Sequence, residues 1–147
     1  MNDTPDKTDK LEAPWLLLFG AWLVTALSVT GSLFFSEVME YAPCVLCWWQ
    51  RVFMFPLLAI LLLGLFPFDG RVVRYALPLS GLGAAVALYH TLLYEGVIPE
   101  TISPCSEGAS CTEVFFELGI ISIPLLSFLA FGTISALLVL LNRKLAS

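Results

Sequence analysis

Four cysteines, arranged as two close pairs, are the residues of this sequence best suited to chemistry. Cys44 and Cys47 form a C-x-x-C pair, and Cys105 and Cys111 follow with five residues between them. Thiols at such spacings can close a readily opened disulfide, bind zinc, or staple a loop. Thiol–disulfide exchange is therefore the first chemistry to consider.

The C-x-x-C pair is placed where a helix is expected to begin. Pro43 suits a first helical turn, and the unpaired N–H groups of that turn lower the pKa of a nearby thiol. Arg51 lies four residues after Cys47 on the same helical face, and no other Lys or Arg lies inside an apolar segment. We expect a functional role for Arg51, since an unpaired charge there is costly; the alternative is a side chain that extends to the membrane surface.

The single histidine, His90, lies about four residues before the end of the third apolar segment, at a depth close to that of Arg51. Two donors at one level would stabilise the negative charge that develops on the carbonyl oxygens of a quinone during reduction. A hydrogen bond between two helices is the alternative role for His90.

These residues must be positioned by membrane helices. The chain has 147 residues, 59% of them hydrophobic and 13% charged, which is too apolar for an ordinary soluble domain. Each of four apolar stretches is long enough to cross a membrane: 14–35, 45–66, 75–94 and 118–141. Three contain a proline expected to bend the helix: Pro56, Pro78 and Pro124. The sequence predicts an all-α, integral membrane four-helix bundle, with residues 1–147 as a single domain.

The distribution of charge predicts the orientation. Six of the seven Lys and Arg residues lie in the N-terminal tail, the link 67–74 and the C-terminal tail. The links 36–43 and 95–117 have none and carry seven of the twelve acids. Because Lys and Arg are retained in the cytoplasm, we expect both termini inside and both cysteine pairs on the periplasmic or extracytoplasmic side of the cytoplasmic (inner) membrane. The bases are too few for nucleic-acid binding.

The second cysteine pair, Cys105 and Cys111, which we call the outer pair, allows three interpretations. The segment from Cys105 to Cys111 is polar and rich in small residues, so we expect an exposed disulfide that another protein's thiolate can attack. A purely structural staple is the second interpretation. A four-cysteine zinc site is the third; we expect no metal, because the two pairs flank different helices and an oxidising compartment favours disulfides.

The segment from Pro43 to Arg51, P-C-V-L-C-W-W-Q-R, closely resembles a known signature, C-x-x-C-[WY]-x-[QE]-R. It is typical of the DsbB-type thiol–quinone oxidoreductases, and the chain is most similar to the short, BdbC-like members. The resemblance extends over nearly the whole chain and includes His90, Cys105 and Cys111.

The resemblance implies a relay. The Cys105–Cys111 disulfide would be attacked, with Cys105 forming a mixed disulfide, by the reduced dithiol of an extracytoplasmic DsbA-like thioredoxin-fold protein. Electrons would pass to Cys44 and Cys47, and the Cys47 thiolate would donate them to ubiquinone or menaquinone from the membrane pool. Larger members carry a long insertion between the outer cysteines, so the short loop here leaves open whether a Cys44–Cys105 bond forms.

The same resemblance assigns Arg51 to stabilising the thiolate and the reduced quinone ring, with His90 assisting. Two other functions stay open. One is the same relay dedicated to a single substrate protein. The other is a non-enzymatic scaffold or small transporter stapled by two structural disulfides.

Overall fold

The computed structural model describes residues 7–102, 105, 111 and 122–147, and for residues 7–11 and 100 the backbone alone. Within these parts the chain forms four long helices and no strand: α1 (Lys7–Leu33), α2 (Val45–Leu65), α3 (Val73–Tyr94) and α4 (Ile123–Ala146). All four are long and apolar enough to cross a membrane. The predicted all-α membrane four-helix bundle is confirmed.

Several helix ends differ from the predicted segments. α1 begins at Lys7, because the polar residues before the span are also helical, and it continues as a π-helix, η1 (Phe34–Val38). α4 begins at Ile123, so Pro124 lies in its first turn, where a missing N–H costs nothing. The expectation that Pro124 bends a helix interior is therefore wrong, while residues 118–121 of the predicted span lie outside the described residues.

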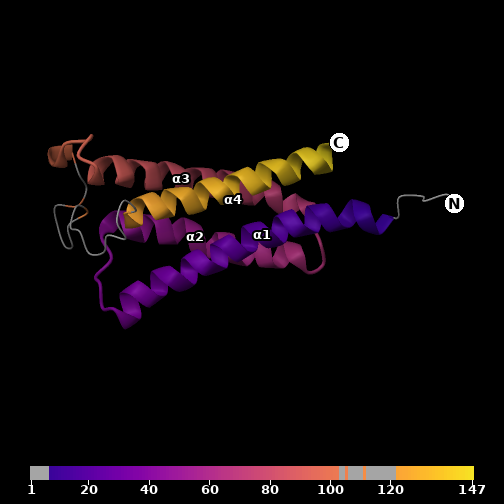
Figure 1. Ribbon diagram of the computed structural model, residues 1–147, viewed down its shortest axis with the longest axis horizontal. Helices are drawn as coiled ribbons and strands as arrows, with labels where there is room; N and C mark the ends of the chain where they lie inside the picture. The colour runs from indigo at the N-terminus through magenta and orange to yellow at the C-terminus, as the bar shows by residue number, and fades with distance from the viewer. Residues whose placement is uncertain (1–6, 103–104, 106–110, 112–121) are drawn as a thin grey trace.

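The helices form a ring. α1 packs against α2 and α4, and α3 packs against the same two helices (Figure 1). Each helix contributes fully buried apolar side chains to the centre, among them Leu18, Leu57, Leu61, Ala87, Phe131, Ile134 and Leu138. Large apolar side chains also cover the outside, as a lipid environment requires.

α3 and α4 approach closely because α3 carries small residues. A Cβ added to Gly83 would collide with the ring of Phe131, and the Ser135 hydroxyl donates to the Ser80 hydroxyl at 3.0 Å. Small residues and hydrogen bonds of this kind hold helices together where hydrophobic exclusion from water does not operate.

The beginning of α1 and the end of α4 lie at one end of the bundle (Figure 1). The beginnings of α2 and α4 and the end of α3 lie together at the opposite end. Residues near these three helix ends are therefore neighbours, although they are far apart in the sequence.

Candidate active site

The start of α2 positions the C-x-x-C pair. Cys44 is the N-cap, in an extended conformation (φ −71°, ψ 169°), and its sulfur accepts a hydrogen bond from the backbone N–H of Cys47 at 3.4 Å. The helix starts at Val45, so Pro43 precedes the cap and is not in the first turn. A sulfur at a helix N-terminus lies next to unpaired N–H groups, which favour its ionised form.

Cys44 and Cys47 are both free, with their sulfurs 3.0 Å apart and joined by a hydrogen bond. That bond is the largest cause lowering the pKa of the Cys44 thiol from the ordinary 9.0 to about 4; burial opposes the change, and His90 adds to it. Negative charge in the dithiol therefore concentrates on Cys44. The resemblance assigned the donating thiolate to Cys47, and that role stays a prediction.

The outer pair forms a disulfide between Cys105 and Cys111. Cys111 is 5% exposed and packs in a small apolar cluster with Cys44, Leu46 and Leu93, whereas Cys105 is only half-buried. The expectation that the pair is exposed is therefore wrong for Cys111, because this sulfur is inserted against the ends of α2 and α3. The residues between the two cysteines lie outside the described chain.

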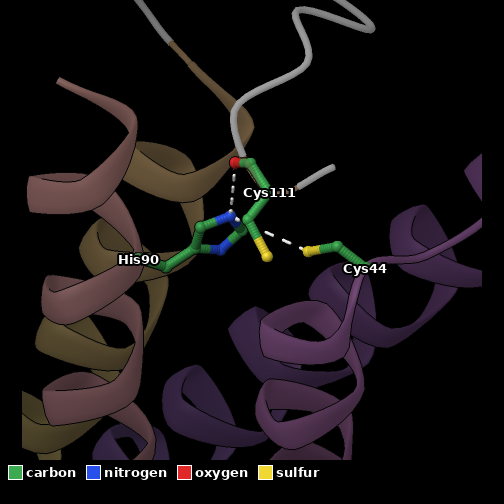
Figure 2. Close-up of side chains that lie close together, drawn as sticks. All are labelled: Cys44, His90 and Cys111. Carbon is green, nitrogen blue, oxygen red and sulfur yellow. Dashed lines mark hydrogen bonds between the residues drawn. The ribbon is translucent and has the colours of Figure 1, made fainter. Parts of the chain in front are cut away.

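His90 links the two pairs (Figure 2). Its Nε2 lies 3.8 Å from the Cys44 sulfur and 3.3 Å from the Cys111 carbonyl oxygen, and its Nδ1 lies 3.0 Å from the side-chain nitrogen of Gln50. A carbonyl oxygen can only accept, so Nε2 carries the hydrogen in the neutral ring and Nδ1 accepts from Gln50. The ring thus shares its one N–H group between the Cys111 carbonyl oxygen and the Cys44 sulfur.

Arg51 is held between α1 and α2. Its Nε donates to the Ser32 hydroxyl and its Nη2 to the Ser32 carbonyl, each at 2.8 Å, and its guanidinium lies 5.4 Å from the centre of the Trp48 ring. These bonds turn the side chain toward α1. The alternative, a side chain that only extends to the membrane surface, does not describe this arrangement.

A cavity of about 530 Å³ adjoins the C-x-x-C pair. Its walls come mainly from the halves of α1, α2 and α4 that lie nearest the cysteines, and most of its lining is apolar. Cys47, Arg51 and His90 all line it, so the donors expected at one level do meet at one space. Each has its own protein partner there, and the described residues show no hydrogen bond between Arg51 and His90.

The cluster has spacings that a metal ion could bridge. Ligand atoms of Cys44, His90 and Cys111 lie within 4.8 Å of one another. The sulfur of Cys111, however, is bonded to Cys105. A cysteine binds a metal as a thiolate, and a disulfide sulfur is not one. The cluster is therefore arranged for exchange between sulfurs and not, in this state, as a metal centre.

Comparison with known proteins identifies the group to which this arrangement belongs. The family model described as disulfide bond formation protein DsbB matches residues 13–141. The chain belongs to the DsbB family. Members are membrane oxidoreductases that form disulfides, and this chain is accordingly a multi-pass membrane enzyme of that kind.

Individual relatives of the DsbB family match over most of their length. A probable disulfide formation protein of Metapseudomonas resinovorans is 48% identical over 132 residues, covering 88% of this chain and 92% of the relative. Disulfide bond formation protein C of Bacillus subtilis is 38% identical over 132 residues, covering 88% and 94%. No solved structure matches significantly.

Two residues of this DsbB-family site were missed in the sequence. In the sequence Gln50 is only one letter of the signature, yet its buried side chain orients His90. Nothing in the sequence indicates that Ser32 holds Arg51. The signal available for both was a polar residue within an apolar segment, which is too common to identify a partner.

Proposed function

We propose that this DsbB-family enzyme oxidises the dithiol of a DsbA-like thioredoxin-fold protein and passes the electrons to a membrane quinone. One observation supports this most directly: the sulfurs of Cys44 and Cys111 lie within 4.8 Å of each other, next to a largely apolar cavity. A disulfide reachable by proteins and a dithiol reachable by a lipid-soluble oxidant thus adjoin.

The cysteine end of the bundle faces the extracytoplasmic side of the cytoplasmic (inner) membrane. The distribution of Lys and Arg supports this orientation, because the connections at the cysteine end have none. Disulfides persist in that compartment, and thioredoxin-fold oxidants act there.

The partner reacts first at Cys105. This sulfur is half-buried, whereas Cys111 is buried, so an incoming thiolate reaches Cys105 more easily. The attack forms a bond between the partner and Cys105, breaks the Cys105–Cys111 bond and releases Cys111 as a thiolate.

The second exchange joins the two pairs. We call Cys44 and Cys47 the inner pair, and before this step they are joined as a disulfide. The Cys111 thiolate attacks Cys44, which forms a Cys44–Cys111 disulfide and releases Cys47 as a thiolate. The partner's second thiolate then attacks the mixed disulfide, which closes the partner's own disulfide and releases Cys105 as a thiolate. Cys105 attacks Cys111 in the Cys44–Cys111 disulfide. The outer disulfide is thereby restored, and Cys44 and Cys47 remain as a dithiol. The His90 N–H group, 3.8 Å from the Cys44 sulfur, stabilises negative charge on it. A Cys44–Cys105 bond is not needed.

The cavity fits a quinone ring. Its volume of about 530 Å³ is typical of small-molecule sites, and its few polar groups include Arg51 and His90. Quinone bound there supplies the oxidant, taking up the two electrons and two protons that the inner dithiol gives up when Cys44 and Cys47 close to a disulfide. Cys47 as a thiolate donates the electrons, and Arg51 stabilises negative charge on the Cys47 sulfur and on the quinone ring oxygen. The net reaction converts one dithiol and one quinone to one disulfide and one quinol.

Purified protein in lipid nanodiscs, mixed with a reduced thioredoxin-fold protein and ubiquinone or menaquinone, tests the proposal. We expect quinone absorbance to fall in equal measure with the appearance of partner disulfide, and Cys44→Ala to abolish both. Cys105→Ala should block partner oxidation and accumulate a Cys44–Cys111 disulfide, detected by non-reducing peptide mapping. Absence of quinone reduction with both quinones would refute the proposed function.

A further inference from the structure

We propose that Ser32 is a positioning residue: an uncharged clamp that fixes the Arg51 guanidinium at the cavity wall without neutralising its charge. This inference rests on the proposed quinone reaction and deepens it, because it names the group that keeps Arg51 effective. Ser32 belongs to α1, and Arg51 to α2, so the clamp joins two helices at the cavity.

The geometry is that of a two-point clamp. The Ser32 hydroxyl oxygen accepts a hydrogen bond from Nε of Arg51, and the Ser32 carbonyl oxygen accepts one from Nη2, both at 2.8 Å. One serine thereby presents two oxygens to one edge of the guanidinium, as a carboxylate does when it binds arginine through two parallel bonds. The guanidinium is planar, so fixing one edge fixes the orientation of the whole group.

No carboxylate among the described residues compensates the positive charge that the clamp holds. In the described parts of the chain the only ion pair joins Arg71 and Asp69, at the opposite end of α2, and no carboxylate lies within 4.0 Å of Arg51. A carboxylate in place of Ser32 would hold the same edge but would cancel the charge. The protein therefore orients a cation and retains its field for negative charge that develops during the reaction.

Without the clamp, the Arg51 side chain could adopt a conformation that points away from the cavity. It lies less than two turns from the start of α2, so its long side chain can extend to the aqueous surface. The Ser32 bonds hold it at the cavity, and the Trp48 ring covers the guanidinium at 5.4 Å. α1 changes to π-helical winding two residues after Ser32, a feature frequent at functional sites.

Three substitutions separate orientation from charge. Ser32→Ala removes one acceptor and should lower kcat/KM for quinone roughly tenfold, as expected for a lost hydrogen bond to a charged group. Ser32→Thr keeps the hydroxyl and should restore the value. Ser32→Asp keeps two acceptor oxygens but neutralises the cation, and should lower kcat/KM below that of Ser32→Ala. Thr30→Ala is the matched control, since the Thr30 hydroxyl bonds only its own helix, at the Ala26 carbonyl, and is exposed.

Two further readouts distinguish the clamp from a structural role. Formation of the mixed disulfide with the partner at Cys105, measured with quinone absent, should be unchanged in all Ser32 variants. In an Arg51→Lys background, Ser32→Ala should have little further effect, because the two residues act as a unit.

The outcomes are separable. If the intact protein reduces quinone and Ser32→Ala and Ser32→Asp both behave like Thr30→Ala, the clamp is refuted and the proposed function stands. Equal losses in Ser32→Ala and Ser32→Thr would also refute it, because the hydroxyl would then be irrelevant. If the intact protein fails to reduce quinone, both proposals fall together.

Discussion

Ionisation of Cys44 in the inner dithiol is the feature of this site that can be measured most directly. The pKa of the thiol is lowered from 9.0 to about 4, first by the hydrogen bond with Cys47 and then, against the opposing effect of burial, by His90. At pH 7 an ordinary thiol is only about 1% thiolate. Cys44 should be a thiolate almost completely at that pH and should become protonated only as the pH falls through about 4.

Substitution of its neighbours should raise the midpoint in a defined order. Cys47→Ala removes the largest cause and should raise the pKa of Cys44 most. Cys47→Ser retains a hydrogen-bond donor and should raise it less, and His90→Ala should also raise it less than Cys47→Ala. The order follows from the relative strength of the two contacts, with sulfurs 3.0 Å apart in one case and a sulfur–nitrogen distance of 3.8 Å in the other.

The assay is a pH titration of ultraviolet thiolate absorbance in a Cys105→Ala, Cys111→Ala protein, in which only the inner cysteines remain. The midpoint is the readout and not the alkylation rate, because nucleophilicity falls as the pKa of a thiol falls. Alkylation and peptide mapping then identify which sulfur is ionised. A midpoint near 9.0, an unchanged midpoint in Cys47→Ala, or preferential labelling of Cys47 at low pH would refute the reasoning.

Two further predictions concern packing and the cavity. Gly83→Ala should destabilise the bundle by about 1–3 kcal/mol, because the new methyl group meets the buried Phe131 ring, whereas Gly81→Ala, with open space at its Cβ, should not lower the thermal midpoint. Equal midpoints for the two variants would contradict this packing. Ala130→Trp should raise the KM for quinone by filling part of the cavity that Ala130 lines, while Ala136→Trp, exposed on the same helix, should leave KM unchanged. An unchanged KM in Ala130→Trp would place the quinone elsewhere.

The fold and the chemically reactive residues were largely predictable. Hydropathy over about 20 residues marks each span, since a helix must satisfy its own backbone in lipid. The signature around Cys44 and Cys47 marked the start of α2, because helix caps depend on neighbouring residues. The start of α4 was less predictable, since an apolar sequence continues on both sides of Pro124 and only the cap conformation of Ser122 fixes the boundary.

The contacts that make the site were not predictable in the same way. His90 meets Cys44 across 46 residues and Gln50 across 40, and Arg51 meets Ser32 across 19. Each contact depends on the rotation of one helix about its axis relative to another. Hydrophobic periodicity is a poor guide to that rotation in a membrane, because both the buried and the lipid-facing sides are apolar.

The sequence by itself determined four membrane helices, the charge pattern from which their orientation is inferred, and two cysteine pairs at one end, because hydropathy, charge and caps act over short stretches of chain. Only the tertiary structure decided that Cys111 is inserted beside Cys44, that Gln50 directs His90, and that Ser32 holds Arg51. The physical reason is that these contacts depend on how each helix is rotated and packed against its neighbours, which the fit of side chains across the whole bundle sets.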